Sequence, residues 1–148
     1  MAKLLTSSEA HLNFDDSIAG FAPAQRGIRP PGAAHTAWQL LEHLRICQWD
    51  ILEFSRNPKH ASPAWPDNYW PATDAPPNEE AWDHSIAAFH ADLRAMTKLI
   101  ADPHRDLYAR INHPDAEAKH TLLREALLLA DHNAYHIGQL VLLRRLLT

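Results

Sequence analysis

Residues 121–147 read TLLREALLLADHNAYHIGQLVLLRRLL. Apolar residues recur in this stretch at spacings of three and four, which is the period of an α-helix with one buried face. The spacing predicts a single helix about 40 Å long at ~1.5 Å per residue, the full height of a helical bundle. Charged and polar residues interrupt the apolar run before it reaches the roughly 20 residues that a membrane span requires. We therefore predict a long bundle helix rather than a membrane helix.

Three further helices are expected from the same spacing. The first covers residues 7–21 and is ended by Gly20 and Pro23, and the second covers residues 36–55. The third begins at Asn78, because asparagine is a favoured N-cap and the two glutamates after it complement the helix dipole. Its apolar stripe consists of Trp82, Ile86, Phe89, Leu93, Met96 and Ile100. Steps of four and three put this stripe on one face, so we interpret its residues as core.

The predicted fold class is all-α, since alternating runs of β-branched residues are absent from the sequence. A chain of 148 residues has the usual size of one domain. We expect a four-helix bundle of antiparallel helices in a single domain, residues 1–148. A short helical turn over residues 103–110, capped by Asp102, is expected before the last helix.

A proline-rich segment, residues 57–77, separates the second helix from the third. Its many prolines exclude a regular helix. It also carries Trp65, Tyr69 and Trp70, and such aromatic side chains stabilise a fold when they are buried. We expect an ordered crossover that packs Trp65 and Trp70 against the bundle. Two interpretations stay open, a strap across the helices and a lid over a pocket.

Composition and charge exclude several classes of function. The formal net charge is −4, which provides no basic surface for nucleic acid or for an anionic membrane. One cysteine forms no internal disulfide and no cysteine-rich zinc site. Because no targeting signal is visible at the start of the sequence, we expect a cytoplasmic protein. The unusual feature is the presence of 11 histidines.

Two of these histidines, His132 and His136, are four residues apart in the last predicted helix. At that spacing both imidazoles project from one face, so that two nitrogens can bind one metal ion. The face is largely apolar and is expected to point inward, where histidines need partners for their lone pairs. The glutamate that follows the first histidine in zinc proteases is replaced by Asn133, so peptide hydrolysis of that type is not supported.

A third ligand has to come from another helix, and His43 in the second helix is the strongest candidate. Taken alone, a histidine on an apolar helix face is more often a core residue. Beside the inward-facing pair it becomes the preferred ligand. Cys47, one turn later, is the rival ligand, although we interpret it as a small buried hydrophobic residue. Asp50 and Gln39 share the His43 face as outer groups or additional oxygen ligands. We expect the other histidines to lie at the surface.

The sequence resembles the DinB-like superfamily, also called the DinB/YfiT-like metalloenzymes. The resemblance rests on His43 in the second helix and on DHNAYHIGQL, residues 131–140, with weaker similarity at PAWP, residues 63–66, and YWP, residues 69–71. It implies a four-helix bundle, often a homodimer, with a divalent metal ion held by His43, His132 and His136. Members of the superfamily include metal-dependent transferases that use low-molecular-weight thiols.

Three protein nitrogens leave coordination positions open, which is typical of a catalytic metal site. Such a site lowers the pKa of a bound water or binds a thiol as thiolate. Imidazoles suit Zn, Ni, Fe or Cu, and we take Zn, Ni, Fe or Mn as the candidate ions. We therefore expect a metal-dependent transferase or hydrolase with a three-histidine site. The alternative is a non-catalytic stress-response or small-molecule-binding module that carries a metal.

Overall fold

The computed structural model describes residues 2–6 and 10–148. The elements, in chain order, are α1 (Ala2–Thr6), α2 (Phe14–Ile18), the 3-10 turn η1 (Pro23–Gln25), α3 (Ala37–Arg56), the 3-10 turn η2 (Asp67–Tyr69), α4 (Glu79–Ala101) and α5 (Leu122–Leu147). The described residues contain no strand, only an isolated β-bridge between Arg110 and Thr121. The predicted all-α fold class is confirmed.

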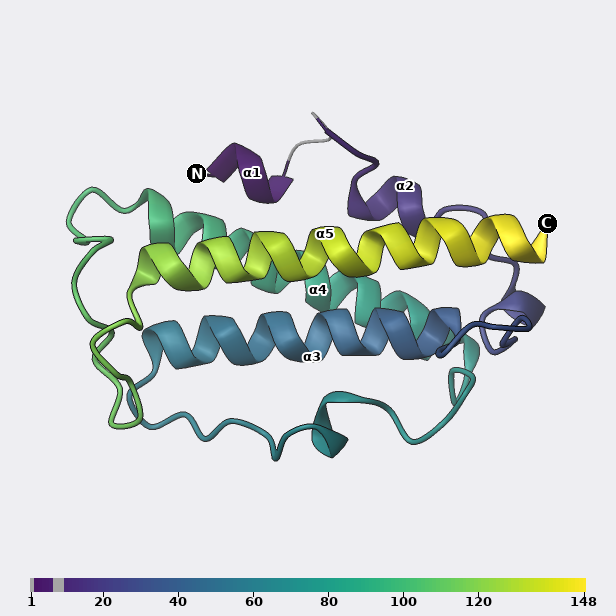
Figure 1. Cartoon of the computed structure of the whole chain (residues 1–148), viewed down its shortest axis with the longest axis horizontal. Helices are drawn as coiled ribbons and strands as arrows, with labels where there is room; N and C mark the ends of the chain where they lie inside the picture. Colours follow the sequence, from purple (N-terminus) through teal and green to yellow (C-terminus); the bar gives the residue numbers. More distant parts are fainter. Residues whose placement is uncertain (1, 7–9) are drawn as a thin grey trace.

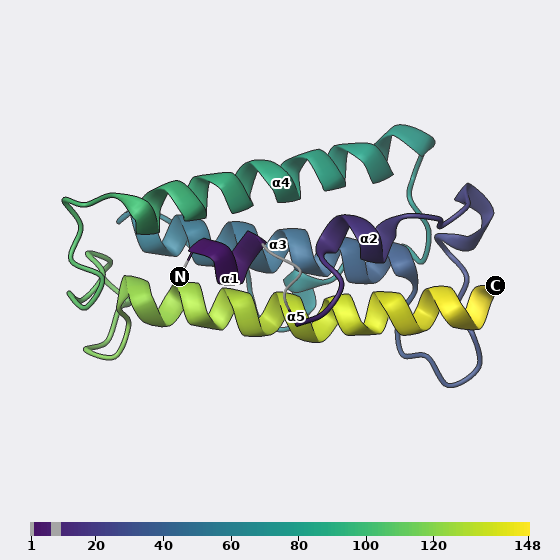
Figure 2. The same cartoon turned by 90° about the horizontal axis from the view of Figure 1, so that it is seen from above.

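Three long helices, α3, α4 and α5, form the body of the molecule (Figure 1). The helix α3 packs against both α4 and α5. α3 and α4 run in the same direction and α5 runs in the opposite one, as Figures 1 and 2 show. The prediction of four antiparallel helices is therefore wrong. The reason is the crossover, residues 57–78, which returns along the length of α3 before α4 begins.

Side-chain caps explain why the three long helices begin where the sequence predicts. The Thr36 hydroxyl accepts a hydrogen bond from the Gln39 N–H, and the Asn78 amide oxygen accepts one from the Ala81 N–H. The Thr121 hydroxyl does the same for the Arg124 N–H. Each cap satisfies a backbone donor that has no partner within its helix. The predicted second and fourth helices begin and end within one residue of α3 and α5, and the predicted third helix begins within one residue of α4.

The predicted first helix, residues 7–21, is wrong as a continuous element. Residues 7–9 lie outside the described residues, and residues 10–13 are not helical. Asn13 caps α2 instead, since its side-chain oxygen accepts the Asp16 N–H at 2.8 Å. An asparagine that bonds to the following backbone favours a helix start at that position over a continuing helix. Among the described residues of the expected range, only the short α2 is an α-helix, and an unpredicted short helix, α1, precedes that range.

The expected helical turn over residues 103–110 is also wrong. That segment contains turns and one bridge residue but no helix. The Asp102 carboxylate accepts the His104 N–H, and the Asp106 carboxylate accepts the Tyr108 N–H, both at 2.9 Å. Aspartates that bond two residues ahead stabilise tight turns, so each stops the backbone from continuing as a helix.

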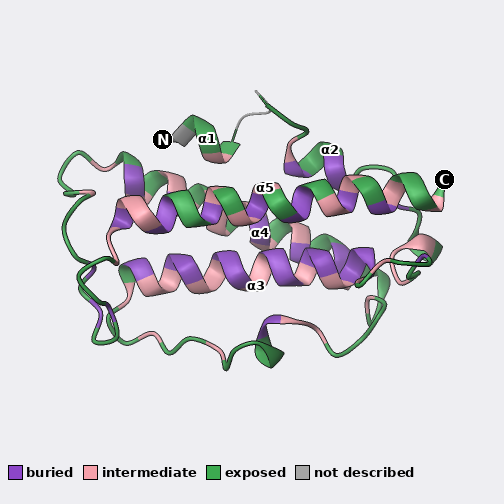
Figure 3. Ribbon diagram, in the orientation of Figure 1, coloured by how far each residue is buried: buried purple, intermediate pink, exposed green. Residues whose placement is uncertain are grey.

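The core lies between the three long helices. The predicted stripe of α4 points into it, because Trp82, Phe89, Met96 and Ile100 are buried and Ile86 and Leu93 pack beside them. Along α3 nearly every residue is buried or half-buried, whereas the outer side of α5 is exposed (Figure 3). Among the described residues, no helix is both long and apolar enough to cross a membrane.

The crossover packs on the bundle through Trp70 but not through Trp65. The Trp70 ring is half-buried and lies between two imidazoles, whereas Trp65 is 74% exposed. The only ring that Trp65 contacts among the described residues belongs to Tyr69, edge-on at 5.2 Å. The expectation that Trp65 packs against the bundle is therefore wrong. Residues 69–70 of the crossover cover the side chain of His43.

Candidate metal centre

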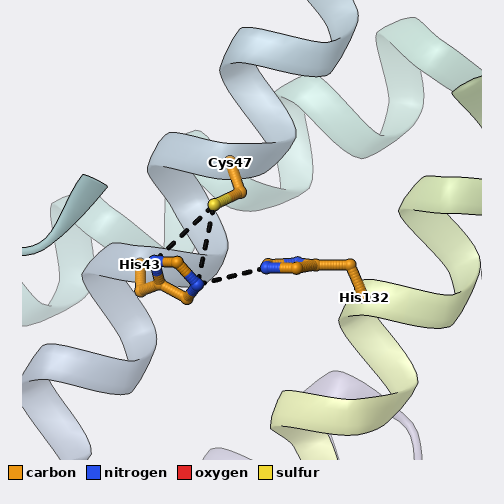
Figure 4. Close-up of side chains that lie close together, drawn as sticks. All are labelled: His43, Cys47 and His132. Atoms are coloured by element: carbon orange, nitrogen blue, oxygen red, sulfur yellow. Dashed lines mark hydrogen bonds between the residues drawn. The ribbon is translucent and has the colours of Figure 1, made fainter. Parts of the chain in front are cut away.

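Two facing helices bring the candidate ligands together. His43 and Cys47 lie one turn apart on α3, and His132 projects toward them from α5 (Figure 4). The neighbouring turn of α5 adds His136. The prediction that the second and fourth expected helices are neighbours is confirmed, because His43 and His132 lie in direct contact.

The distances within this cluster match those between atoms that share one metal ion. Nε2 of His43 and Nε2 of His132 are 3.1 Å apart. Two nitrogens that each lie ~2.0–2.1 Å from one ion are roughly 2.8–3.4 Å apart. Sγ of Cys47 is 3.7 Å from Nε2 of His43, close to the roughly 3.1–3.6 Å expected for a sulfur and a nitrogen on one zinc ion.

The compact group of ligand atoms differs from the one that the sequence predicts. Among the residues described, His43, Cys47 and His132 have ligand atoms that all lie within 4.8 Å of one another. The group is thus two histidines and a cysteine rather than the expected three histidines. The reason is local, because Cys47 lies one helical turn after His43 and its sulfur turns toward the His43 ring. Our interpretation of Cys47 as a simple hydrophobic residue misses this contact.

His136 lies beside the group without belonging to it. Its ring centre is 4.7 Å from that of His43 and 4.5 Å from that of His132. Its Nδ1 is 2.9 Å from the Gln139 side-chain oxygen. An amide oxygen only accepts, so Nδ1 carries the proton and Nε2 carries the lone pair. Gln139 therefore orients His136 and prepares its other nitrogen for a ligand.

The crossover orients His43 in the same way. Nδ1 of His43 is 2.9 Å from the Tyr69 backbone oxygen, and Trp70 stacks on the His43 ring at 3.7 Å with an interplanar angle of 1°. Because a carbonyl only accepts, Nδ1 is the protonated nitrogen and Nε2 presents its lone pair to His132. A second imidazole, that of His35, stacks on the opposite face of Trp70 at 3.8 Å.

Burial keeps the imidazoles neutral. It lowers the pKa of His43 and of His132 to about 4, with smaller contributions from the neighbouring imidazoles. It also lowers the pKa of His136. The Cys47 thiol responds in the opposite direction, because burial and the nearby Asp50 carboxylate raise its pKa to about 12. At neutral pH the cluster therefore holds free nitrogen lone pairs beside a protonated thiol.

These observations fit a divalent metal ion. Nε2 of His43 carries a lone pair and lies 3.1 Å from Nε2 of His132, a separation that either a proton on His132 or a cation bound by both nitrogens satisfies. Imidazole and thiolate are the donors that zinc and other borderline metals prefer, whereas Mn prefers oxygen. Of the predicted ions, Zn and Ni fit this donor set better than Mn.

The cluster is largely enclosed. His43, Cys47 and His136 are 3%, 6% and 7% exposed, while His132 is half-buried. The solvent-facing edge of the cluster is therefore the side of His132. A separate cavity of about 460 Å³ lies between α4 and α5, near α1 and α2, and its lining contains none of these four residues.

Asp50 and Gln39 hold the crossover. The Asp50 carboxylate accepts hydrogen bonds from the Tyr69 hydroxyl and the His60 ring, both at 2.7 Å. The Gln39 side chain bonds to Thr36 and to Asp74. Asp50 thus lies one residue away from the candidate ligand His43, through Tyr69, whereas the Gln39 side chain bonds to no residue of the candidate site.

Three residues near the cluster, Tyr69, Trp70 and His35, are absent from the predicted site. The only signal for Tyr69 and Trp70 in the sequence is the YWP motif in the proline-rich segment, and His35 has no such signal. The expectation that the histidines other than His43, His132 and His136 lie at the surface is wrong for His60 and His113. His113 is 4% exposed, and the His60 side chain is 6% exposed. The His60 ring bonds to Asp50 of α3, and the His113 ring bonds to the His60 backbone oxygen, which joins the last loop to the crossover.

Comparison with known proteins identifies one family. The model of the DinB superfamily matches residues 9–140, which is most of the chain. No curated protein and no solved structure matches the chain significantly. The matched range contains His43, Cys47 and His132 as well as the neighbouring His136, so the family assignment and the geometry concern the same part of the molecule.

Proposed function

Since the chain belongs to the DinB superfamily, we propose that it binds one divalent metal ion through His43, Cys47 and His132. The observation that carries this proposal is the 3.1 Å separation of the two Nε2 atoms. Tyr69 fixes the lone pair of His43 toward this point, and burial keeps both rings neutral. The protein thus presents ligand atoms that need no further deprotonation of the imidazoles before a cation binds.

His136 is a second candidate for the third ligand. The three ring centres of His43, His132 and His136 are 4.5–5.0 Å apart. Three imidazoles that bind one ion at ~2.0–2.1 Å have centres roughly 4.5–5.2 Å apart. This agreement supports the three-histidine set that the sequence and the family resemblance favour. The two sets differ in chemistry, because only one of them contains a sulfur.

An optical titration with Co²⁺ tests the proposal. We expect one equivalent to bind the wild-type protein, with an intense near-ultraviolet thiolate band that the Cys47→Ala variant lacks. His43→Ala and His132→Ala should each weaken binding strongly. His84→Ala, at an exposed position of α4, is the matched control and should bind as the wild type does.

The outcomes of this titration separate the two ligand sets. If Cys47→Ala binds normally and His136→Ala does not, the three-histidine set replaces the one with sulfur. If the wild-type protein shows no saturable binding, the proposal fails.

We further propose that the bound ion serves a transferase or hydrolase reaction, with a low-molecular-weight thiol as one substrate class. A three-ligand site leaves positions for an incoming group, and a metal ion supplies Lewis acidity that lowers the pKa of a coordinated water or thiol. The chain's own part is to bind the ion, to hold His43 by the Tyr69 carbonyl and to exclude water with the Trp70 ring.

Turnover assays distinguish this enzyme from a binding module. A panel of thiols with electrophilic acceptors, run with Zn²⁺-loaded wild type and His132→Ala, should give product with the wild type alone. Equal turnover by both proteins would exclude the metal from the reaction and favour the non-catalytic alternative, a stress-response or small-molecule-binding module.

We also propose a homodimer that forms through the outer face of α5. Leu128, Tyr135 and Leu142 follow one another at seven-residue spacing and are 38%, 65% and 58% exposed. Such a stripe on a helix is suited to pairing with a second copy by two-fold symmetry. Sedimentation at micromolar concentration should give about twice the chain mass of 16.7 kDa. A Leu142→Glu variant should sediment as a monomer, and a monomeric wild type would contradict the proposal.

A further inference from the structure

One residue of the crossover, Tyr69, is bound to α3 at both of its ends. Its backbone oxygen meets Nδ1 of His43 at 2.9 Å, and its hydroxyl donates to the Asp50 carboxylate at 2.7 Å. Both partners belong to α3, two turns apart. Tyr69 therefore links Asp50 to His43, because its hydroxyl bonds to the Asp50 carboxylate and its backbone carbonyl bonds to the His43 ring.

This path is built from buried groups. Tyr69 is 8% exposed and the Asp50 side chain 14% exposed. The other Asp50 oxygen accepts a hydrogen bond from Nε2 of His60 at 2.7 Å, so the carboxylate is fixed from two sides. A further bond joins Nε2 of His113 to the His60 backbone oxygen at 2.8 Å. Asp50 thus has little freedom to move, and neither has the phenol that bonds to it.

We propose that Tyr69 is the positioning residue of the metal centre, held in place by Asp50. The proposal rests on the proposed function, since it assigns the residue that sets the orientation and tautomer of the ligand His43. A ligand imidazole usually donates its second N–H to an oxygen, and loss of that partner weakens metal binding by about 10–100-fold. Here the oxygen belongs to a loop, so its place depends on the hydrogen bond between Tyr69 and Asp50.

The Tyr69→Phe variant tests this role with the smallest change. It keeps the ring and the backbone carbonyl and removes only the hydroxyl that bonds to Asp50. We expect its affinity for Zn²⁺, measured by competition with a chromophoric chelator, to fall on the order of 10-fold. The matched control is Tyr108→Phe, at a position 76% exposed, which should bind Zn²⁺ as the wild type does. An unchanged affinity in Tyr69→Phe would overturn the proposal.

A double variant shows whether Tyr69 acts through Asp50. If both residues serve one hydrogen bond, adding Tyr69→Phe to Asp50→Ala should cause no further loss of Zn²⁺ affinity. Additive losses would overturn the path from Asp50 to His43. Circular dichroism of each metal-free variant identifies a loss that arises from unfolding. In that case the milder Asp50→Asn replaces Asp50→Ala.

A measurement without metal separates this inference from the proposed function. Nitrogen-15 NMR of the metal-free protein at pH 7 reports which His43 nitrogen carries the proton. We expect Nδ1–H in the wild type and a mixture of tautomers in Tyr69→Phe. A wild type that binds no Zn²⁺ but shows this change would refute the metal proposal and retain the positioning role. A wild type that binds Zn²⁺ no more tightly than Tyr69→Phe would refute the positioning role alone.

Discussion

The pH dependence of metal affinity reveals whether Cys47 is a ligand. The Cys47 thiol has a pKa of about 12. To bind a metal ion as thiolate at pH 7, it must therefore lose its proton about five pH units below its pKa. This deprotonation opposes metal binding by roughly 7 kcal/mol at pH 7. His43 and His132, with pKa values of about 4, are already deprotonated. Between pH 6.5 and 8.5 the affinity of the wild type should therefore rise about tenfold per pH unit.

Calorimetry in buffers of different ionisation enthalpy counts the protons that Zn²⁺ releases. We expect one proton per ion for the wild type and none for Cys47→Ala, whose affinity should then be almost independent of pH in this range. A wild type that releases no proton, or a slope that persists in Cys47→Ala, would refute the assignment of the thiolate as a ligand. In that case the neutral imidazole of His136 would be the third donor.

Three further results are expected from the fold itself. Because the pKa values of His43 and His132 are about 4 when folded and near ~6.5 when unfolded, the unfolded chain binds more protons between these values. The unfolding free energy of the metal-free protein should therefore fall below pH 6.5, by up to ~1.4 kcal/mol per pH unit for each ring. Urea titrations that show no such fall would contradict the conclusion that His43 and His132 are buried in their neutral form. Leu41→Ala, at a fully buried position, should lower that free energy by about 2–5 kcal/mol, whereas Leu127→Ala, 45% exposed, should change it by about 0.5 kcal/mol or less in the same titration. Asn78→Ala should cost about 1 kcal/mol through the lost cap of α4, and a stability equal to that of the wild type would show that the cap is dispensable.

The long helices could be predicted because their determinants are local. The Asn78 and Thr121 caps and the apolar periodicity act within a few residues, so the sequence displays them directly. The predicted antiparallel direction of α4 relative to α3 is wrong, because this direction depends on how far the crossover travels before the next helix starts. The prediction of the first helix is wrong for a local reason, since the Asn13 side-chain oxygen accepts the Asp16 N–H and thereby caps a new helix at that position.

The candidate site was predictable in part. His132 and His136 share a face by helical spacing alone, and His43 follows as their partner from a neighbouring inward face. The closer approach of Cys47 depends on where its sulfur points along α3, which spacing does not determine. Tyr69 was not predictable as an orienting residue, because its contact with His43 uses a backbone oxygen, and any residue type carries one.

The most direct test of the account is the zinc content of the protein after reconstitution and removal of free metal, measured by mass spectrometry beside His43→Ala and His132→Ala. The account predicts one Zn²⁺ per wild-type chain, because the two Nε2 atoms already stand 3.1 Å apart, and much less than one in either variant. Zinc-free wild-type protein, or equal zinc in all three proteins, would contradict the assignment of this cluster as a metal site.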